Sequence, residues 1–559
     1  MNIASIVSTP SEFIVRNYLL GLALIAAVPM IAGLPTGVSA QDQPTAETKS
    51  DSDSDSATEI RYDTVLIGGT IHRGDGSDPM IGHIAILNGK IAKISTTIQP
   101  DGAIRIDCTG LVVAPGFIDL HNHSDDPILK RDTRGNVNYL LQGCTTIVTG
   151  NCGSGHVDVA KYLASIDADG AGTHVAHLLP QGSLRRAVVG SARRDPSEKE
   201  MAKMLVLADQ AMRDGAFGMS TGLIYIPGTL TPTTELIEVA KVISSHGGIY
   251  ASHIRNEGSA LLESVDEAIL IGRQAQLPVH ISHIKASGKS NWGSLRLAID
   301  KIEQARQGGM IITADQYPYA ASSTSLEATL FPSWASEGGR SELRKRLLDP
   351  ETAARIRSEL VTQLAGSSRI QLVSCPHNPK WIGRSIDEIA NDENVHPADL
   401  VMTIQEHGGA AVINFGMSEE DMRLAMPVAW IATASDGGAK VPSDNMPHPR
   451  SFGTFPRKIG RYAIGDSVMS MAAAIRSCSG LPAEILGITD RGTIATGLYA
   501  DLVVFDPAAF IDRATYNEPY IPPVGLKHVL VEGKLAIYES QATGVLAGRA
   551  IRKQRPAAP

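Results

Sequence analysis

Cysteine is scarce in this sequence, and the few cysteines that occur are odd in number: Cys108, Cys144, Cys152, Cys375 and Cys478. At least one thiol is therefore unpaired, unless the chain is cross-linked to another. Two uses remain open for the neighbouring pair, Cys144 and Cys152. They could form a disulfide with each other, or one of them could serve as a metal-bound thiolate.

An excess of positive charge is also missing. The formal net charge is −9, and acidic and basic residues are interspersed along the chain. No basic stripe of the kind that binds nucleic acid is present, so we expect no nucleic-acid partner. The composition favours a protein that acts on small molecules.

Charged residues are absent from 17 to 41, where an apolar core ends in the small residues Val38, Ser39 and Ala40. This pattern predicts a cleaved secretory peptide over residues 1–40. An uncleaved membrane anchor is the alternative, but the apolar core is short for a membrane span and is broken by Gly21, Pro29, Gly33 and Pro35. We therefore expect an exported protein, periplasmic or secreted, without stable membrane insertion after cleavage. Residues 41–59 have the composition of a disordered linker.

The remaining chain is long and apolar enough for one large domain with smaller additions. Hydrophobic residues make up 43% of the sequence and charged residues 19%, which is typical of a globular protein with a large core. Short β-type runs separated by glycine-rich turns occupy residues 60–114 and return in residues 486–552. Because domain termini usually lie close together, we expect these two stretches to form one β-sandwich.

Between these stretches, residues 115–485 alternate strand-like and helix-like patterns. Eight strands are predicted, at 116–120, 145–149, 174–180, 216–221, 248–253, 278–283, 310–316 and 429–435. Helical periodicity is clearest at 197–213, 232–245, 260–276 and 294–306. Eight such units predict an α/β fold of the (β/α)8 barrel type. A further strand-like run, Ala411 to Phe415, falls at the end of an interval, 324–427, that is too long for one crossover and indicates an inserted subdomain.

Two histidines close the first predicted barrel strand, in the stretch V-A-P-G-F-I-D-L-H-N-H-S from Val113 to Ser124. Alternate residues of a strand share a face, so His121 and His123 point the same way and can hold one divalent metal from one side. Taken alone, the pair is weak evidence for a metal site, because solvated histidines at a strand end explain it better. Its weight comes from the ends of the other strands.

Candidate metal ligands close several later strands as well. Cys152 follows the second strand, His253 and His283 end the fifth and sixth, and Asp436 follows the eighth. The carboxyl ends of barrel strands all face one cup, so these side chains are expected to meet in a metal site. For Asp436 the alternative is a turn-forming residue before two glycines. His280, three residues before His283, faces the other side of its strand and is expected to be a hydrogen-bonded core histidine.

Nine motifs follow one another between about residue 60 and residue 552: G-F-I-D-L-H-N-H-S-D, T-G-N-C-G, M-S-T-G-L-I-Y-I-P-G, A-S-H-I-R-N-E, H-I-S-H-I-K, D-Q-Y-P-Y, S-D-G-G, H-P-R-S-F-G-T-F-P-R and V-L-A-G-R-A-I-R. In these motifs and their order, the sequence resembles the N-acyl-D-amino-acid deacylases, or D-aminoacylases, of the amidohydrolase superfamily. The resemblance implies a zinc-dependent barrel with a composite β-sandwich.

The resemblance also implies residue roles. Cys152, His253 and His283 would hold a tightly bound zinc, with His121 and His123 at a second, weaker metal position. Zinc with three protein ligands keeps one position open and lowers the pKa of water there to about 7. Asp436 would act as the catalytic acid and base. The carboxylate of the substrate would be bound by four residues: Lys285, Tyr317, Ser323 and Arg450.

Two segments depart from the pattern of the family. Residues 180–185 read P-Q-G-S-L-R where relatives commonly have a Gly-His pair, and the loop after Asp436 is longer than usual. Both departures bear on the shape of the substrate pocket rather than on the ligands. The expected activity is zinc-dependent hydrolysis of linear N-acyl-D-amino acids. Two alternatives remain: a metal-dependent amidohydrolase acting on dipeptides or cyclic amides, and a non-catalytic exported metal-binding barrel.

Overall fold

The computed structural model describes residues 61–97 and 99–554. The predicted secretory peptide and linker lie outside these residues. The described chain belongs to one compact unit, which begins at Ile60. None of its described helices has the length and the apolar character needed to cross a bilayer.

Eight parallel strand positions form the barrel. The strands are β6 (Phe117–Asp119), β7 (Cys144–Thr149), β8 (His174–His177) with its continuation β9 (Leu179–Pro180), β10 (Gly218–Gly222), β11 (Ile249–His253), β12 (Val279–Ile281), β13 (Ile312–Gln316) and β17 (Ile431–Thr433). They lie in a three-stranded sheet of β6, β7 and β8 and a six-stranded sheet that runs from β9 to β17. The barrel closes where the backbone N–H of His123 donates to the carbonyl of Gly437 at 2.7 Å. All eight predicted strands are present, and the (β/α)8 class is confirmed.

Amphipathic helices surround the barrel. They include α2 (Val159–Asp169), α3 (Gln181–Val188), α4 (Glu198–Arg213), α5 (Thr233–Ser245), α6 (Leu261–Ala275), α7 (Ser294–Gln307), α15 (Met471–Cys478) and α16 (Gly480–Leu486). Helix α4 begins with a capping box in which Ser197 and Glu200 satisfy each other's backbone N–H groups. Its apolar residues at helical spacing, among them Met204 and Ala208, are buried, whereas Val206 on the other face is exposed.

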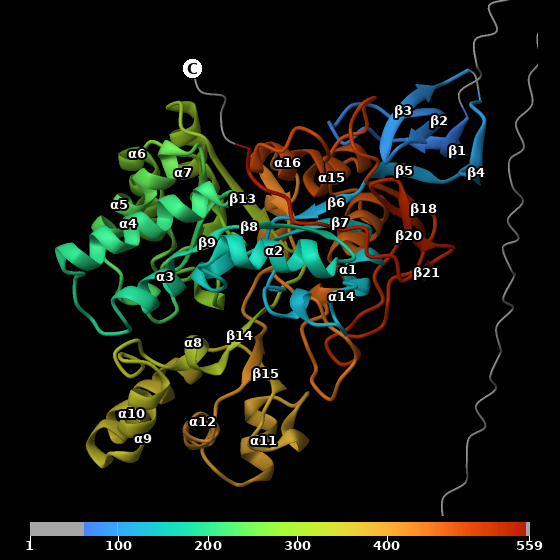
Figure 1. Ribbon diagram of the computed structural model, residues 1–559. Coiled ribbons are helices and arrows are strands. Elements are labelled where there is room, and N and C mark those ends of the chain that lie inside the picture. Colours follow the sequence, from blue (N-terminus) through green and yellow to red (C-terminus); the bar gives the residue numbers. More distant parts are fainter. Residues whose placement is uncertain (1–60, 98, 555–559) are drawn as a thin grey trace, which may run out of the picture. The chain divides into compact units, whose positions relative to one another are not determined.

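A subdomain is inserted between β13 and β17. It contains β14 (Ser322–Ser325), α8 (Leu326–Leu330), α9 (Arg340–Leu348), α10 (Pro350–Ala365), β15 (Ile370–Ser374), α11 (Ile386–Asp392), α12 (Pro397–Glu406) and β16 (Ala411–Asn414). The ninth strand-like run of the sequence is β16, which lies in the middle of a three-stranded antiparallel sheet with β14 and β15. The insertion has a hydrophobic core of its own, which includes Leu360, Leu372 and Val412. In Figure 1 it is the yellow and orange region beside the barrel.

The chain returns from the insertion through α13 (Glu419–Ala425), which packs on α7. The carboxylate of Asp421 on this helix accepts a hydrogen bond from the backbone N–H of Gly293 at 2.9 Å. After β17 come α14 (Arg450–Pro456) and the π-helical segment η6 (Arg457–Gly465). The short turns and helices of the described chain also include η1 (Pro127–Leu129), α1 (Val137–Leu140), η2 (Asn151–Gly153), η3 (Gly228–Leu230), η4 (Lys289–Asn291) and, in the insertion, η5 (Pro379–Trp381).

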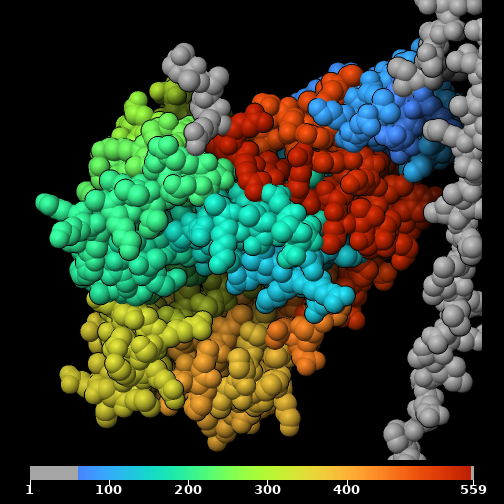
Figure 2. Space-filling view, viewed as in Figure 1, coloured from blue at the N-terminus to red at the C-terminus, as the bar shows by residue number. Residues whose placement is uncertain are grey.

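Strands from residues 62–115 and from residues 502–542 join in a second, nine-stranded sheet. These are β1 (Tyr62–Ile71), β2 (Met80–Leu87), β3 (Lys90–Ser95), β4 (Gly102–Asp107), β5 (Val112–Pro115), β18 (Leu502–Phe505), β19 (Leu526–Val531), β20 (Lys534–Tyr538) and β21 (Gln541–Ala542). Strand β5 pairs antiparallel with β18, so that Val113 lies opposite Val504. Leu66, Leu502 and Leu530 share one buried core, and Figure 2 shows the blue and red segments in contact. The sequence predicted this union of the two ends.

Candidate metal centre

The carboxyl ends of the barrel strands bring the predicted metal ligands together. His121 and His123 follow β6, Cys152 lies in η2 after β7, His253 ends β11 and His283 follows β12. Potential ligand atoms form groups in which all atoms lie within 4.8 Å of one another. One group contains His121, Cys152 and His283, and another contains His121, His123 and Asp436. A third such group consists of His253, Glu257 and His283.

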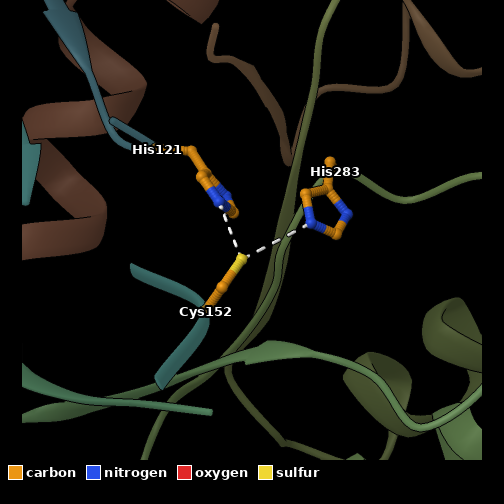
Figure 3. A group of neighbouring side chains, drawn as sticks. All are labelled: His121, Cys152 and His283. Atoms are coloured by element: carbon orange, nitrogen blue, oxygen red, sulfur yellow. Dashed lines mark hydrogen bonds between the residues drawn. The ribbon is translucent and has the colours of Figure 1, made fainter. Parts of the chain in front are cut away.

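The Cys152 thiol is the centre of the first group (Figure 3). Its Sγ is 3.2 Å from Nε2 of His121, 3.7 Å from Nδ1 of His253 and 3.8 Å from Nε2 of His283. Zinc bonds of about 2.3 Å to sulfur and about 2.0 Å to nitrogen place tetrahedral S···N edges about 3.6 Å apart. The distances from Cys152 to His253 and His283 are slightly longer than such an edge, and the distance to His121 is shorter. The compact group of ligand atoms around Cys152 contains His121 and His283 rather than His253.

Three residues of the site have left-handed backbone conformations, which residues other than glycine rarely adopt. The φ angles are 50° at Cys152, 36° at His283 and 49° at Asp436. Such conformations cost about 1 to 3 kcal/mol each and are retained where a side chain must be aimed in a particular direction. Gly150, two residues before Cys152, has a φ of 76°, and a Cβ atom there would lie 2.0 Å from the carbonyl oxygen of Leu178. Only glycine fits at this position of the turn that leads to Cys152.

The donor set fits a zinc ion. A buried thiol and imidazole nitrogens converge, and thiolate with imidazole is the ligand combination that zinc prefers. Without a metal, burial raises the pKa of the Cys152 thiol well above its ordinary value, and the carboxylates of Asp436 and Glu257 add to this effect. All five cysteines carry free thiols, so the alternative disulfide between Cys144 and Cys152 is not formed.

Asp436 lies between the histidines and an arginine. Its Oδ1 atom is 3.0 Å from Nε2 of His123 and 3.6 Å from Nε2 of His121, and its Oδ2 atom is 2.9 Å from Nη1 of Arg450. Burial alone would raise the pKa of this carboxyl group. The guanidinium of Arg450, followed by His121 and His283, outweighs burial and holds the pKa of Asp436 well below its ordinary value.

The four residues predicted to bind a carboxylate form one contiguous group. The guanidinium of Arg450 lies 4.8 Å from the ring centroid of Tyr317, and its Nη2 donates to the carbonyl of Ser323 at 3.1 Å. Lys285 lies on the other side, with Nζ 5.8 Å from the same ring centroid. Arg450 and Ser323 line the cavity above the ligands, whereas Lys285 and Tyr317 are not among its lining residues.

Two carboxylates around the ligands were not identified from the sequence. Oε1 of Glu257 lies 2.9 Å from Nδ1 of His283 and 2.5 Å from Nζ of Lys285. Oδ2 of Asp315 lies 3.5 Å from Nδ1 of His121, and its Oδ1 accepts the backbone N–H of His283 at 2.8 Å. Both residues stand in motifs that carry the resemblance. Asp315 is near the end of the seventh barrel strand, a position that could have identified it.

His280 is a hydrogen-bonded core histidine, as its spacing from His283 predicted. Its Nδ1 is 2.9 Å from Oγ1 of Thr313, and its Nε2 is 2.8 Å from Oδ2 of Asp315. This contact helps to hold the carboxylate of Asp315, which lies beside His121 and His283.

A cavity of about 410 Å³ opens above the ligands. His123, Cys152, Asp436 and Arg450 belong to its lining, which also includes Tyr225, Arg186, Gly182, Ser323 and Thr324. Arg186 is exposed and donates from Nη2 to the carbonyl of Ile226 at 2.7 Å. Among the described residues no carboxylate pairs with it. The cavity therefore combines a metal-binding floor with a positively charged wall.

Comparison with known proteins shows the family of the chain. A sequence profile of the amidohydrolase family matches residues 381–537. The barrel, the second sheet and the clustered histidines thus define a metal-dependent amidohydrolase.

The nearer relationship is to D-aminoacylases. The chain is 34% identical to the D-aminoacylase of Alcaligenes xylosoxydans xylosoxydans over 517 residues, which cover 88% of this chain and 98% of that protein. A solved D-aminoacylase with a binuclear metal centre is 32% identical, with a TM-score of 0.77 over 88% of this chain and all of that one. The N-acyl-D-glutamate deacylase of Bordetella bronchiseptica, solved with zinc and a phosphonate inhibitor, is 29% identical, with the same TM-score and coverage. The chain belongs to the D-aminoacylase family.

Proposed function

We propose that this protein is a zinc-dependent N-acyl-D-amino-acid deacylase. It hydrolyses the amide bond of a linear N-acyl-D-amino acid and releases a carboxylate and the free D-amino acid. The observation that carries the proposal is the placement of Asp436 between metal-ligand histidines and Arg450, on the floor of a cavity. Membership of the D-aminoacylase family supports the choice of substrate and of its configuration.

Cys152, His253 and His283 hold the catalytic zinc, and His121 and His123 form a second, weaker position. The S···N spacings around Cys152 support the first assignment. The group of His121, His123 and Asp436 supports the second. When bound, zinc supplies a Lewis acid and lowers the pKa of water to about 7.

Asp436 acts as the general base and then as the general acid. Its carboxylate accepts a proton from the attacking water and delivers it to the nitrogen of the leaving amine. His123 and Arg450 hold the two carboxylate oxygens from opposite sides, so that the group is aimed before the substrate arrives. The low pKa of Asp436 keeps it ionised and ready to accept the proton.

Arg450 and Ser323 bind the α-carboxylate of the substrate from the cavity wall, and Tyr317 and Lys285 complete the group behind them. A guanidinium offers a planar fork of donors that matches a carboxylate. Because Arg450 also contacts Asp436, binding of the substrate places its reacting amide close to the base.

Arg186 extends the recognition to the side chain or acyl group of the substrate. It lies on the wall of the same cavity and has no carboxylate partner among the described residues. An exposed ion pair typically contributes about 0.2 to 1 kcal/mol. Substrates with a second acidic group are therefore preferred over neutral ones.

The test is amide hydrolysis by purified protein, measured with and without a zinc chelator. The substrates are N-acetyl amino acids, dipeptides and cyclic amides. Zinc-dependent cleavage of the linear N-acyl compounds is the expected result. Cleavage of only dipeptides or cyclic amides would replace the proposed substrate class, and failure to cleave any compound would leave a non-catalytic metal-binding barrel.

We also propose that the protein is exported and acts in the periplasm or outside the cell. The support is the charge-free apolar segment over residues 17–41 and its small-residue end. Cell fractionation with amino-terminal sequencing tests this proposal. A mature protein that begins near Gln41 in the exported fraction is expected, and an intact cytoplasmic chain would contradict it.

A further inference from the structure

A carboxylate stands behind two of the proposed zinc ligands. Each imidazole has one ring nitrogen facing Cys152: Nδ1 of His253 and Nε2 of His283. The opposite nitrogens face Glu257. Nδ1 of His283 is 2.9 Å from Oε1 of Glu257, and Nε2 of His253 is 3.8 Å from Oε2.

The loop that carries Glu257 is fixed by several contacts. The side chain of Asn256 accepts backbone N–H groups of Gly258 and Ala260 at 2.8 and 3.1 Å. Arg255 forms an ion pair with Glu267 on α6, and the backbone N–H of Ser287 donates to the carbonyl of Glu257 at 2.7 Å. The carboxylate is therefore held in place rather than free to rotate into solvent.

We propose that Glu257 is the positioning residue of the zinc centre. By accepting the N–H on Nδ1 of His283, it leaves the lone pair of Nε2 directed at the metal position. Nε2 of His253, at 3.8 Å, is too far from Glu257 for a hydrogen bond and interacts only with its charge. The physical reason is that a neutral imidazole carries one N–H and one lone pair, and the hydrogen bond on one nitrogen decides which nitrogen can bind a metal.

Lys285 has a part in the same arrangement. Its Nζ lies 2.5 Å from Oε1 of Glu257 and 2.8 Å from Nδ1 of His283, and its side chain is buried. An ammonium group can only donate, so a bond from Lys285 to Nδ1 of His283 would put the ring N–H on Nε2, the nitrogen that faces Cys152. With Nε2 free for the metal, Nδ1 carries the N–H, and Oε1 of Glu257 is the acceptor for both His283 and Lys285. Glu257 is therefore the group that sets the imidazole orientation, and it also offsets the charge of Lys285.

The test compares Glu257→Gln with the wild type by zinc affinity, measured through competition with a chelator of known affinity. The visible spectrum of the cobalt-substituted protein provides a second readout. Loss of a carboxylate behind a metal-bound histidine typically weakens metal binding about 10- to 100-fold. We expect that loss together with an altered cobalt spectrum. The control is Glu235→Gln, because Glu235 is also a buried carboxylate but is paired with Arg185 instead of a ligand histidine.

The outcomes are decisive. If zinc affinity and the cobalt spectrum of Glu257→Gln match those of the wild type, the inference is overturned. If affinity is unchanged and only KM rises, Glu257 acts on substrate binding through Lys285, which also overturns it. If Glu257→Gln does not fold, Glu257→Asp, which retracts the carboxylate by one methylene group, should still show weakened zinc binding. The inference rests on the proposed zinc centre: a wild type that binds no zinc would refute that centre itself.

Discussion

Asp436 and Arg450 form a buried ion pair, with Oδ2 of the carboxylate 2.9 Å from Nη1 of the guanidinium. The pair joins the residue proposed to move the proton to a residue proposed to bind the substrate. This geometry couples recognition to catalysis. When Arg450 binds the carboxylate of the substrate, the amide bond of the same substrate lies beside Asp436, the proposed base.

Replacement of Asp436 by asparagine removes the proton acceptor and keeps the shape of the side chain. Loss of a general base typically lowers the rate about 10²- to 10⁴-fold. We expect kcat of Asp436→Asn to fall by this factor while one tightly bound zinc remains. Steady-state kinetics and metal analysis of the same preparation check both parts. Activity within tenfold of the wild type would exclude Asp436 as the base.

Replacement of Cys152 by alanine removes the only sulfur ligand of the proposed zinc centre. We expect the protein to purify without tightly bound zinc and without activity. Cys144→Ala is the matched control, because Cys144 on β7 is also buried but belongs to the hydrophobic core. Zinc content and activity of both variants give the comparison. Equal zinc content in the two would assign the ligand set to other residues.

His123 separates the two metal positions. Its Nε2 contacts Asp436, whereas the spacings around the Cys152 thiol involve His121, His253 and His283. His123→Ala should therefore retain one tightly bound zinc and lose the second, weaker equivalent. Titration of metal-free protein, followed by calorimetry, measures both equivalents. The assignment fails if the tight equivalent is lost instead.

The ends of the barrel strands were predictable from sequence because two local signals coincide there. Strand-prone apolar runs end directly in ligand-type residues, as Ile118 and Leu120 do before His121. One strand after another repeats this pattern, and barrel geometry then places the ends together. The composite sheet was predictable for a similar reason, since short β-type runs with tight turns occur in both parts of the chain.

Other features depend on contacts that no local pattern contains. The run Ala411–Asn414 has the same apolar character as a barrel strand, yet it pairs antiparallel with β14 and β15, because the inserted helices bury it in a separate core. The local sequence pattern around Glu257 is that of an acidic residue in a surface loop. Only the fold of its loop turns it towards His283 and Lys285.

Arg186 is expected to set a preference for acidic substrates. Arg186→Met should lower kcat/KM for N-acetyl-D-glutamate about two- to fivefold, since loss of one exposed ion pair costs up to about 1 kcal/mol. Neutral substrates should change little. Arg340→Met is the control, because Arg340 lines only the adjoining cavity. An equal loss for acidic and neutral substrates would exclude a role in selectivity.

Lys458 is buried, and its Nζ donates to the carbonyl of Met426 at 3.3 Å without a carboxylate partner among the described residues. Burial lowers its pKa from 10.5 to about 8. The folded state thus disfavours the charged amine, so stability rises as pH increases from about 8 to about 10.5 and is lowest below that window. A shift of this size corresponds to about 3 kcal/mol.

Lys458→Met should accordingly raise the free energy of unfolding at pH 7 by up to about 3 kcal/mol, with the gain disappearing above pH 10.5. Denaturant unfolding at several pH values measures the difference. Lys203→Met, at an exposed position of α4, is the control and should show no such pH dependence. A gain independent of pH would show that packing, not the buried charge, is responsible.

The central claim is most directly tested by chiral detection of the amino acid released from paired N-acetyl-D and N-acetyl-L substrates. Acidic, aromatic and aliphatic members are offered to the zinc-loaded protein. The account predicts zinc-dependent release from the D compounds alone, fastest for the acidic members. Release from the L compounds at comparable rates would contradict it, even if the zinc dependence held.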